Sequence, residues 1–288
     1  GSPVTDEFSH QFMACVTPAY PGYDAATAPR YEEYLRLAYA GADRLLGFLR
    51  GLFPPSASVL VSSDHGFGAA WRSINANLVL QRAGLLELDT DQRPSPESRA
   101  VAYWAGGTCN VYVNLAGREP GGVVPRAQFE TVRERLAAAF TALNGERGEE
   151  HRTLEQLRAR IHEPARVIER VYRFEETAAV PTSCGPASMR FAGRTGDVVV
   201  FAAPPYQFDA PEPDELVSDS PLLGQHGYLP DAVDERLNVN MRPPLVLAGP
   251  GVRRGALVHG ARAIDLAPTL SRLLGIDPPA QADGHALL

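Results

Sequence analysis

The segment from residue 31 to residue 66 limits the possible folds of this chain more than any other feature. Tyr31 to Leu52 carries apolar side chains at helical spacing, and Pro54-Pro55 follows as a stop signal. The next apolar run, Ala57 to Ser63, has the length of a buried strand and is closed by Asp64-His65-Gly66. A helix that leads into a buried strand is half of a β-α-β unit, so we expect a parallel sheet with helices on its faces.

Two further apolar runs and one further helix fit the same architecture. Residues 197–201 and 244–249 have the composition and length of strands. A helix is expected from about Ile264 to Leu274, because Asp265 lies near its start and Gly275 just beyond its end. The sequence therefore predicts an α/β fold of alkaline phosphatase-like type, with a mostly parallel sheet flanked by helices.

The middle of the chain reads as an insertion into this core. Residues 111–115 alternate like a strand, a Gly/Pro turn follows, and two charged stretches, about 126–143 and 154–174, have helical character. We expect residues 1–85 and 196–288 to form the α/β core. Residues 86–195 are expected to form an inserted, cap-like subdomain.

Composition excludes several classes of function. The chain contains no lysine and has a net charge of -7, so neither a lysine Schiff base nor a Walker-type phosphate loop is possible. An acidic chain offers no general attraction to nucleic acid. No apolar run approaches the roughly 20 residues that span a bilayer. Cys15, Cys109 and Cys184 are scattered, which favours reduced thiols and slightly favours the cytoplasm.

Three short segments carry the side chains that are suited to catalysis or metal binding. Asp6 and His10 lie four residues apart, Asp64-His65-Gly66 follows a strand, and His226 is flanked by glycines. Reactive groups of open α/β sheets gather at the carboxyl ends of strands, and divalent metal ions take mixtures of imidazole nitrogen and carboxylate oxygen. For Asp64 and His65 to face one ion the chain must already turn, and Gly66 permits that.

In this order the three segments resemble one family. Asp-x-x-x-His, Ser-Asp-His-Gly-Phe and His-Gly-Tyr are similar to motifs of the type I phosphodiesterase and nucleotide pyrophosphatase branch of the alkaline phosphatase superfamily, and most like its bacterial predicted phosphohydrolases or phosphomutases. The resemblance extends over nearly the whole chain, through Asn75–Leu85, Asn114–Gly122 and the C-terminal stretch from Ala263 to Gly284.

The resemblance implies a two-metal site for hydrolysis of a small phosphodiester or phosphomonoester. Asp6, His10 and His226 would bind one ion, and Asp64 and His65 would help bind the other. Zinc is the first choice for these two divalent ions and manganese the second.

The family pattern also places an Asp ligand and a Thr or Ser nucleophile before the Asp-x-x-x-His motif, where this chain has only five residues. Gly1-Ser2 is typical of a cloning remnant. We therefore expect a C-terminal fragment that lacks its nucleophile and the N-terminal half of the same protein, and that is inactive alone although its full-length parent is an enzyme.

Other interpretations remain open at this point. Cys184-Gly-Pro-Ala-Ser188 is similar to a sulfatase modification motif but has Ser188 in place of Arg. A phosphomutase of the same superfamily would use a similar set of metal ligands. A non-catalytic metal-binding or interaction domain is the alternative from another class. Arg118 and Arg190 are candidate phosphate-binding residues, since a guanidinium matches phosphate oxygens; a structural or surface role is the competing hypothesis for each.

Overall fold

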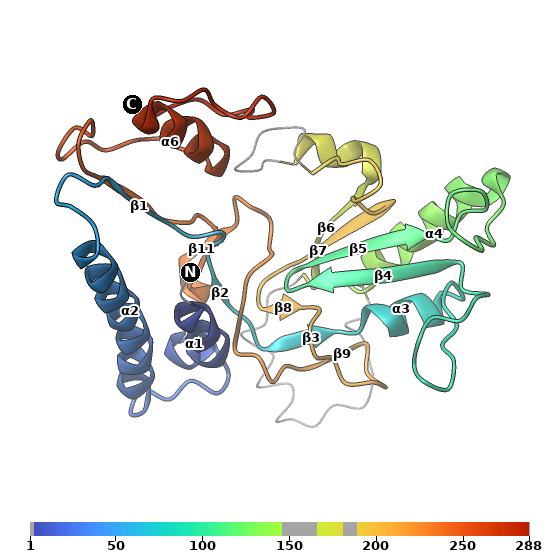
Figure 1. Cartoon of the computed structure of the whole chain (residues 1–288). Helices are drawn as coiled ribbons and strands as arrows, with labels where there is room; N and C mark the ends of the chain where they lie inside the picture. Colours follow the sequence, from blue (N-terminus) through green and yellow to red (C-terminus); the bar gives the residue numbers. More distant parts are fainter. Residues whose placement is uncertain (1–2, 146–165, 181–188, 288) are drawn as a thin grey trace.

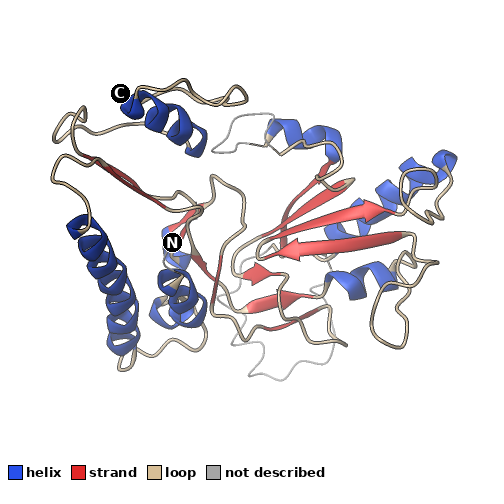
Figure 2. Ribbon diagram, in the orientation of Figure 1, coloured by secondary structure: helices blue, strands red, loops and turns tan. Residues whose placement is uncertain are grey.

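The computed structural model describes residues 3–145, 166–180 and 189–287, and their helices and strands form an α/β arrangement. Figure 1 shows helices α1 and α2 beside a narrow two-stranded ribbon on one side, and a four-stranded sheet with helices behind it on the other. Figure 2 shows the same view by secondary structure. None of the described helices is both long and apolar enough to cross a bilayer.

The four-stranded sheet has the order β4-β5-β7-β6 and is antiparallel throughout. Its strands are β4 (Ala100–Ala105), β5 (Thr108–Val113), β7 (Val198–Ala202) and β6 (Ile168–Arg173). Every residue of β7 is buried, as expected for an apolar run in the middle of a sheet. β5 alternates between buried and half-buried residues, which agrees with the alternation seen in its sequence.

Two helices pack against this sheet and complete the main core. α4 (Phe129–Ala142) follows a 3-10 turn, η2 (Arg126–Gln128), and confirms the helix expected over 126–143. It buries Val132, Leu136 and Phe140, which recur every four residues and so share one face. α3 (Ala76–Arg82) is capped by Asn75, whose side-chain oxygen accepts a hydrogen bond from Leu78 N at 2.9 Å.

The opposite side of the molecule contains the helix expected over residues 31–52 and the strand expected over residues 57–63. α2 (Ala28–Gly51) and β1 (Val59–Ser62) confirm the expected helix and strand. α1 (Val4–Phe12) packs along α2, where the Phe12 ring stacks on Tyr31 with centroids 5.6 Å apart. η1 (Ala14–Val16) follows α1. β13 (Leu245–Ala248) confirms the strand expected over 244–249.

The expected parallel pairing is not what the described strands show. β1 pairs antiparallel with β13. Among the described ladders only the short pairing of β3 (Arg72–Ile74) with β8 (Tyr206–Gln207) is parallel. Nor is either strand buried on both faces, since β1 is mostly half-buried and β13 alternates between half-buried and exposed residues. An apolar run does not specify its pairing partner or its direction. The α/β class is confirmed, whereas the mostly parallel sheet is not seen in the described part of the chain.

One expected helix is wrong over its C-terminal part. Residues 146–165 lie outside the described residues, but Ile168–Arg173 of the stretch 154–174 is the strand β6, followed by the 3-10 helix η4 (Phe174–Ala179). Charged residues at β6 fit an edge strand, because one edge of such a strand faces solvent. The division into a core and an insertion at 86–195 stays a prediction; β7, just after that boundary, pairs with β5 and β6.

The C-terminal helix has the predicted bounds. The 3-10 turn η6 (Ala263–Asp265) leads into α6 (Leu266–Leu274), and Gly275 adopts the left-handed conformation with φ of 67° that commonly ends a helix. The buried Asp265 carboxylate accepts hydrogen bonds from Arg262 N and His285 N, both at 2.9 Å. Burial alone raises the pKa of this carboxyl, but these hydrogen bonds and the nearby Arg262 charge bring it below its ordinary value.

Short ladders connect the two sides of the molecule. β3 also pairs with β9 (Val217–Asp219), and β2 (Gly68–Ala69) pairs with β10 (Gly224–Gln225). β11 (Val233–Asp234) and β12 (Val239–Asn240) form a further pair around η5 (Glu235–Leu237). The β2–β10 ladder matters for function, because it brings the segment after β1 beside the segment that contains His226.

Candidate metal centre

α1 presents the first two candidate ligands on one face. Asp6 and His10 are one helical turn apart, and Asp6 Oδ2 lies 3.5 Å from His10 Nε2. His10 Nδ1 lies 2.8 Å from the carbonyl oxygen of Gly224. A carbonyl only accepts hydrogen bonds, so Nδ1 carries a proton and donates it, and Nε2 is the ring nitrogen that faces Asp6.

Gly224 allows α1 to approach β10 closely enough for that hydrogen bond. A Cβ at position 224 would lie 2.2 Å from Ser9 O, which no side chain could occupy. The His10 orientation therefore depends on a glycine more than 200 residues away in the sequence.

The segment after β1 supplies the next pair of candidate ligands. His65 Nε2 lies 3.8 Å from Asp6 Oδ1 and 3.7 Å from Asp64 Oδ1. The Nδ1 atom of His65 is 2.9 Å from Gly66 O, which again leaves Nε2 free to accept or to bind an ion. Gly66 is required for a different reason from the one expected: a Cβ there would lie 1.9 Å from Asn240 O, so the constraint is a close backbone approach.

Asp64 projects outward from the same segment. Its side chain is 88% exposed. Burial slightly raises its pKa, but hydrogen bonds from the local backbone, the charge of His65 and the hydroxyl of Ser63 bring the pKa of Asp64 below its ordinary value. The carboxylate is therefore ionised at neutral pH, as a metal ligand must be.

His226 completes the group. Its Nε2 lies 4.0 Å from Asp6 Oδ1, and its ring stacks on that of His65 with centroids 3.7 Å apart and an interplanar angle of 17°. Burial lowers the pKa of His226, and electrostatic repulsion between its protonated form and the neighbouring His65 ring lowers it further. Both effects favour the neutral imidazole that binds metal ions.

The structure thus gathers His10, His65 and His226 around Asp6, whereas Asp64 lies at the edge of the group and approaches only His65. Donor atoms of Asp6, His10 and His226 lie within 4.8 Å of one another. Asp6 Oδ1 is buried, and it has no hydrogen-bond donor among the described residues. A buried carboxylate oxygen without a donor is costly, and a divalent cation would offset that cost. The donor set of carboxylate oxygen and imidazole nitrogen therefore fits such an ion.

Phe67 closes one side of the cluster with an apolar wall. Its ring makes edge contacts with His10 and His226, with centroids 4.9 and 5.7 Å apart. An apolar neighbour lowers the local dielectric constant and strengthens the attraction between the carboxylate and a cation.

A cleft of about 350 Å³ opens beside His10 and His226. Its wall includes residues that the sequence did not single out, notably Glu7, Trp104, Asp209 and Gln225. The sequence offered one feature that points to Gln225, its position next to His226. No sequence feature points to Asp209, because it reaches the cleft only through the packing of the segment after β8.

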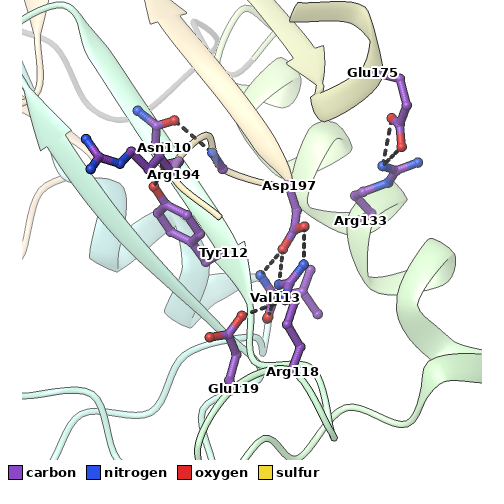
Figure 3. Close-up of polar contacts among 10 residues, drawn as sticks. Asn110, Tyr112, Val113, Arg118, Glu119, Arg133, Glu175, Arg194 and Asp197 are labelled. Carbon is purple, nitrogen blue, oxygen red and sulfur yellow. Dashed lines mark hydrogen bonds and ion pairs between the residues drawn. The ribbon is translucent and has the colours of Figure 1, made fainter. Parts of the chain in front are cut away.

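The two candidate phosphate-binding arginines lie elsewhere. Arg118 forms a two-pronged ion pair with Asp197, at 2.7 Å from Nη1 to Oδ1 and 2.6 Å from Nη2 to Oδ2, and it also binds Glu119 and Val113 O (Figure 3). These contacts occupy its guanidinium and support the structural hypothesis for Arg118. Arg190 is exposed and follows residues 181–188, which lie outside the described residues together with the Cys184 motif.

Comparisons with known proteins identify the family to which the chain is similar. The family model described as type I phosphodiesterase / nucleotide pyrophosphatase matches residues 2–229. Human ectonucleotide pyrophosphatase/phosphodiesterase 5 is similar in structure, with 16% identity, a TM-score of 0.50, and coverage of 97% of this chain and 54% of that chain. The murine protein has 18% identity, a TM-score of 0.49, and coverage of 97% and 53%.

A bacterial enzyme is more distant. Phosphonoacetate hydrolase from Sinorhizobium meliloti, solved with phosphonoacetate, has 16% identity, a TM-score of 0.37, and coverage of 77% of this chain and 43% of that chain. No curated protein matches this chain. The chain spans about half the length of the first solved structures that it matches, at 54% and 53%.

Proposed function

We propose that this chain, which belongs to the type I phosphodiesterase / nucleotide pyrophosphatase family, is the metal-binding part of a hydrolase that cleaves small phosphodiesters or phosphomonoesters. Asp6, His10 and His226 would hold one divalent ion, and Asp64 and His65 would contribute to a second. The bound ions would act as Lewis acids on phosphoryl oxygens and lower the pKa of a hydroxyl or water.

The observation that carries the proposal is the position of Asp6. One of its oxygens faces His10, and the other, which is buried and has no donor among the described residues, faces His65 and His226. Three imidazoles around one carboxylate, two of them with Nδ1 held by a backbone carbonyl, form a set of ligands whose Nε2 atoms all face that carboxylate.

Zinc is the favoured ion and manganese the second choice, because imidazole and carboxylate together suit zinc well. The absence of lysine from the sequence supports a metal-based mechanism for handling phosphate charge. The expectation that a Thr or Ser nucleophile is contributed from outside these 288 residues stays a prediction.

Zinc titration of the 288-residue chain tests the site. Wild type should bind with an affinity that His226→Ala lowers by at least about 100-fold, because a ligand is removed. His259→Ala is the matched control, since His259 is exposed, and it should bind like wild type. Equal zinc binding by wild type and His226→Ala would show that the cluster is not a metal site.

The reaction is tested on the natural gene product loaded with zinc or manganese. Nitrophenyl phosphate diesters and monoesters distinguish the two substrate classes by release of nitrophenol. Zinc binding without turnover of either ester would favour the alternative of a non-catalytic metal-binding domain.

A further inference from the structure

His226 lacks the ring support that the other two histidines have. His10 and His65 each have Nδ1 within 2.9 Å of a backbone carbonyl. Among the residues that the structure describes, no such carbonyl meets the ring of His226, whose hydrogen bonds run through its backbone instead. The direction of this side chain must therefore be set by what holds its main chain, together with the His65 stack.

A side-chain relay holds the backbone N–H of His226. The amide oxygen of Gln225 accepts this N–H at 3.0 Å, and the amide nitrogen of Gln225 donates to Asp209 Oδ2 at 2.8 Å. Asp209 Oδ2 also accepts the N–H of Gly106 at 2.8 Å. Because a carboxylate only accepts, Asp209 fixes which end of the Gln225 amide faces it, and so directs the amide oxygen at His226.

The central member of the relay is buried, whereas Asp209 is half-buried and lines the cleft. Gln225 is only 1% exposed. The tip of the β4–β5 hairpin covers it: Gly107 N donates to His226 O at 2.9 Å, and a Cβ on Gly106 would lie 2.3 Å from His226 O and 2.9 Å from the Gln225 amide. The N–H and the carbonyl of His226 are thus both held, one by the relay and one by the hairpin.

We propose that Asp209 and Gln225 are positioning residues for the His226 ligand and that they act through the hydrogen-bond relay Asp209–Gln225–His226. This inference rests on the proposed metal site, and it assigns a role to two residues whose described side-chain hydrogen bonds reach neither the other candidate ligands nor the His226 ring. Groups that orient a metal ligand typically change affinity by about 10- to 100-fold when removed.

Zinc affinity of the 288-residue chain measures the role. Asp209→Ala and Gln225→Met should each weaken zinc binding by about 10- to 100-fold, because His226 loses its fixed main chain. The double variant should lose no more than about the larger single loss, since both changes break one relay. Asp209→Asn should bind within about 3-fold of wild type, because its amide oxygen can accept both N–H groups.

Asp197→Ala is the matched structural control. Asp197 is also a buried carboxylate that accepts a backbone N–H, from Val113 at 2.7 Å, but it lies at the opposite end of β5 from the hairpin tip. This variant should lose stability and keep its zinc affinity. Circular dichroism identifies any variant that fails to fold. If Asp209→Ala does not fold, the zinc affinity of Gln225→Met, which preserves side-chain volume, tests the relay.

The possible outcomes separate the two proposals. Unchanged zinc affinity in folded Asp209→Ala and Gln225→Met, with a large loss in His226→Ala, would overturn the relay and leave the metal site intact. Equal damage by Asp209→Asn and Asp209→Ala would also overturn it, since the charge rather than the hydrogen bonds would then matter. No difference between wild type and His226→Ala would remove the metal site itself.

Discussion

The imidazole rings of His65 and His226 stack nearly in parallel, 3.7 Å between centroids and 17° between planes, although 160 positions of sequence separate them. One ring follows β1 and the other follows β10, and the β2–β10 ladder brings the two together. Stacked imidazoles cannot both be protonated without mutual repulsion. The pair is therefore suited to a cation that binds both rings in their neutral form.

The first prediction concerns pH in the metal-free protein. Burial and the His65 charge lower the pKa of His226 below 6.5, so the unfolded chain binds more protons than the folded chain as the pH falls through that value. Stability should therefore decrease from about pH 7.5 to about pH 5. NMR titration of the ring protons and urea unfolding measure the two effects, and His226→Asn should reduce the slope. A His226 pKa above 6.5 would contradict this reasoning.

The second prediction concerns Asp6. Asp6→Asn should lower zinc affinity by at least about 10-fold, because it removes the negative charge that three imidazoles share while it preserves the shape. Glu32→Gln is the matched control: it removes one negative charge from an exposed residue of the neighbouring helix α2. Calorimetry with zinc compares the two variants. If both lose affinity equally, the effect is general electrostatics and not ligation.

The third prediction separates a steric clash from backbone strain. Gly106 and Gly117 both have positive φ, 59° and 82°, but a Cβ at Gly106 meets His226 O whereas one at Gly117 meets nothing within 4 Å. Alanine at either site should lower the free energy of unfolding by roughly 1 kcal/mol, because a residue with a Cβ is strained at positive φ. Only Gly106→Ala should lower the free energy of unfolding several-fold more than this and also weaken zinc binding. Thermal unfolding and zinc titration measure both, and equal behaviour of the two variants would contradict the close approach.

The fourth prediction concerns Arg118. Its removal leaves the buried Asp197 carboxylate without its partner. For a fully buried pair, such a change lowers the free energy of unfolding by about 3–5 kcal/mol. Since the Arg118 side chain is 40% exposed, water screens part of this, and we expect about 1–3 kcal/mol. Urea unfolding measures it for Arg118→Ala, with the exposed Arg190→Ala as control. Arg118→Ala should not change zinc affinity; a loss there would revive a role at the site.

Local sequence determined the elements and the identity of the candidate ligands. Helical spacing between residues 31 and 52, the caps around Leu266–Leu274 and the apolar run at 245–248 each depend on neighbouring residues, and the structure confirmed all three. The ligand motifs could be read because side-chain chemistry is fixed by residue type. The error over 168–173 arose where charged residues hid an edge strand, whose pairing partner lies 25 or more positions away.

Only the tertiary structure decided how these pieces meet. The antiparallel partner of β1, the stack of His65 on His226, and the relay from Asp209 to His226 join residues far apart in the chain. Such relationships depend on which surfaces bury one another, and the sequence around each residue carries no record of that choice. The sequence therefore named Asp6, His10, Asp64, His65 and His226, while the fold placed Asp6 between the three imidazoles and gave Gln225 and Asp209 their place beside His226.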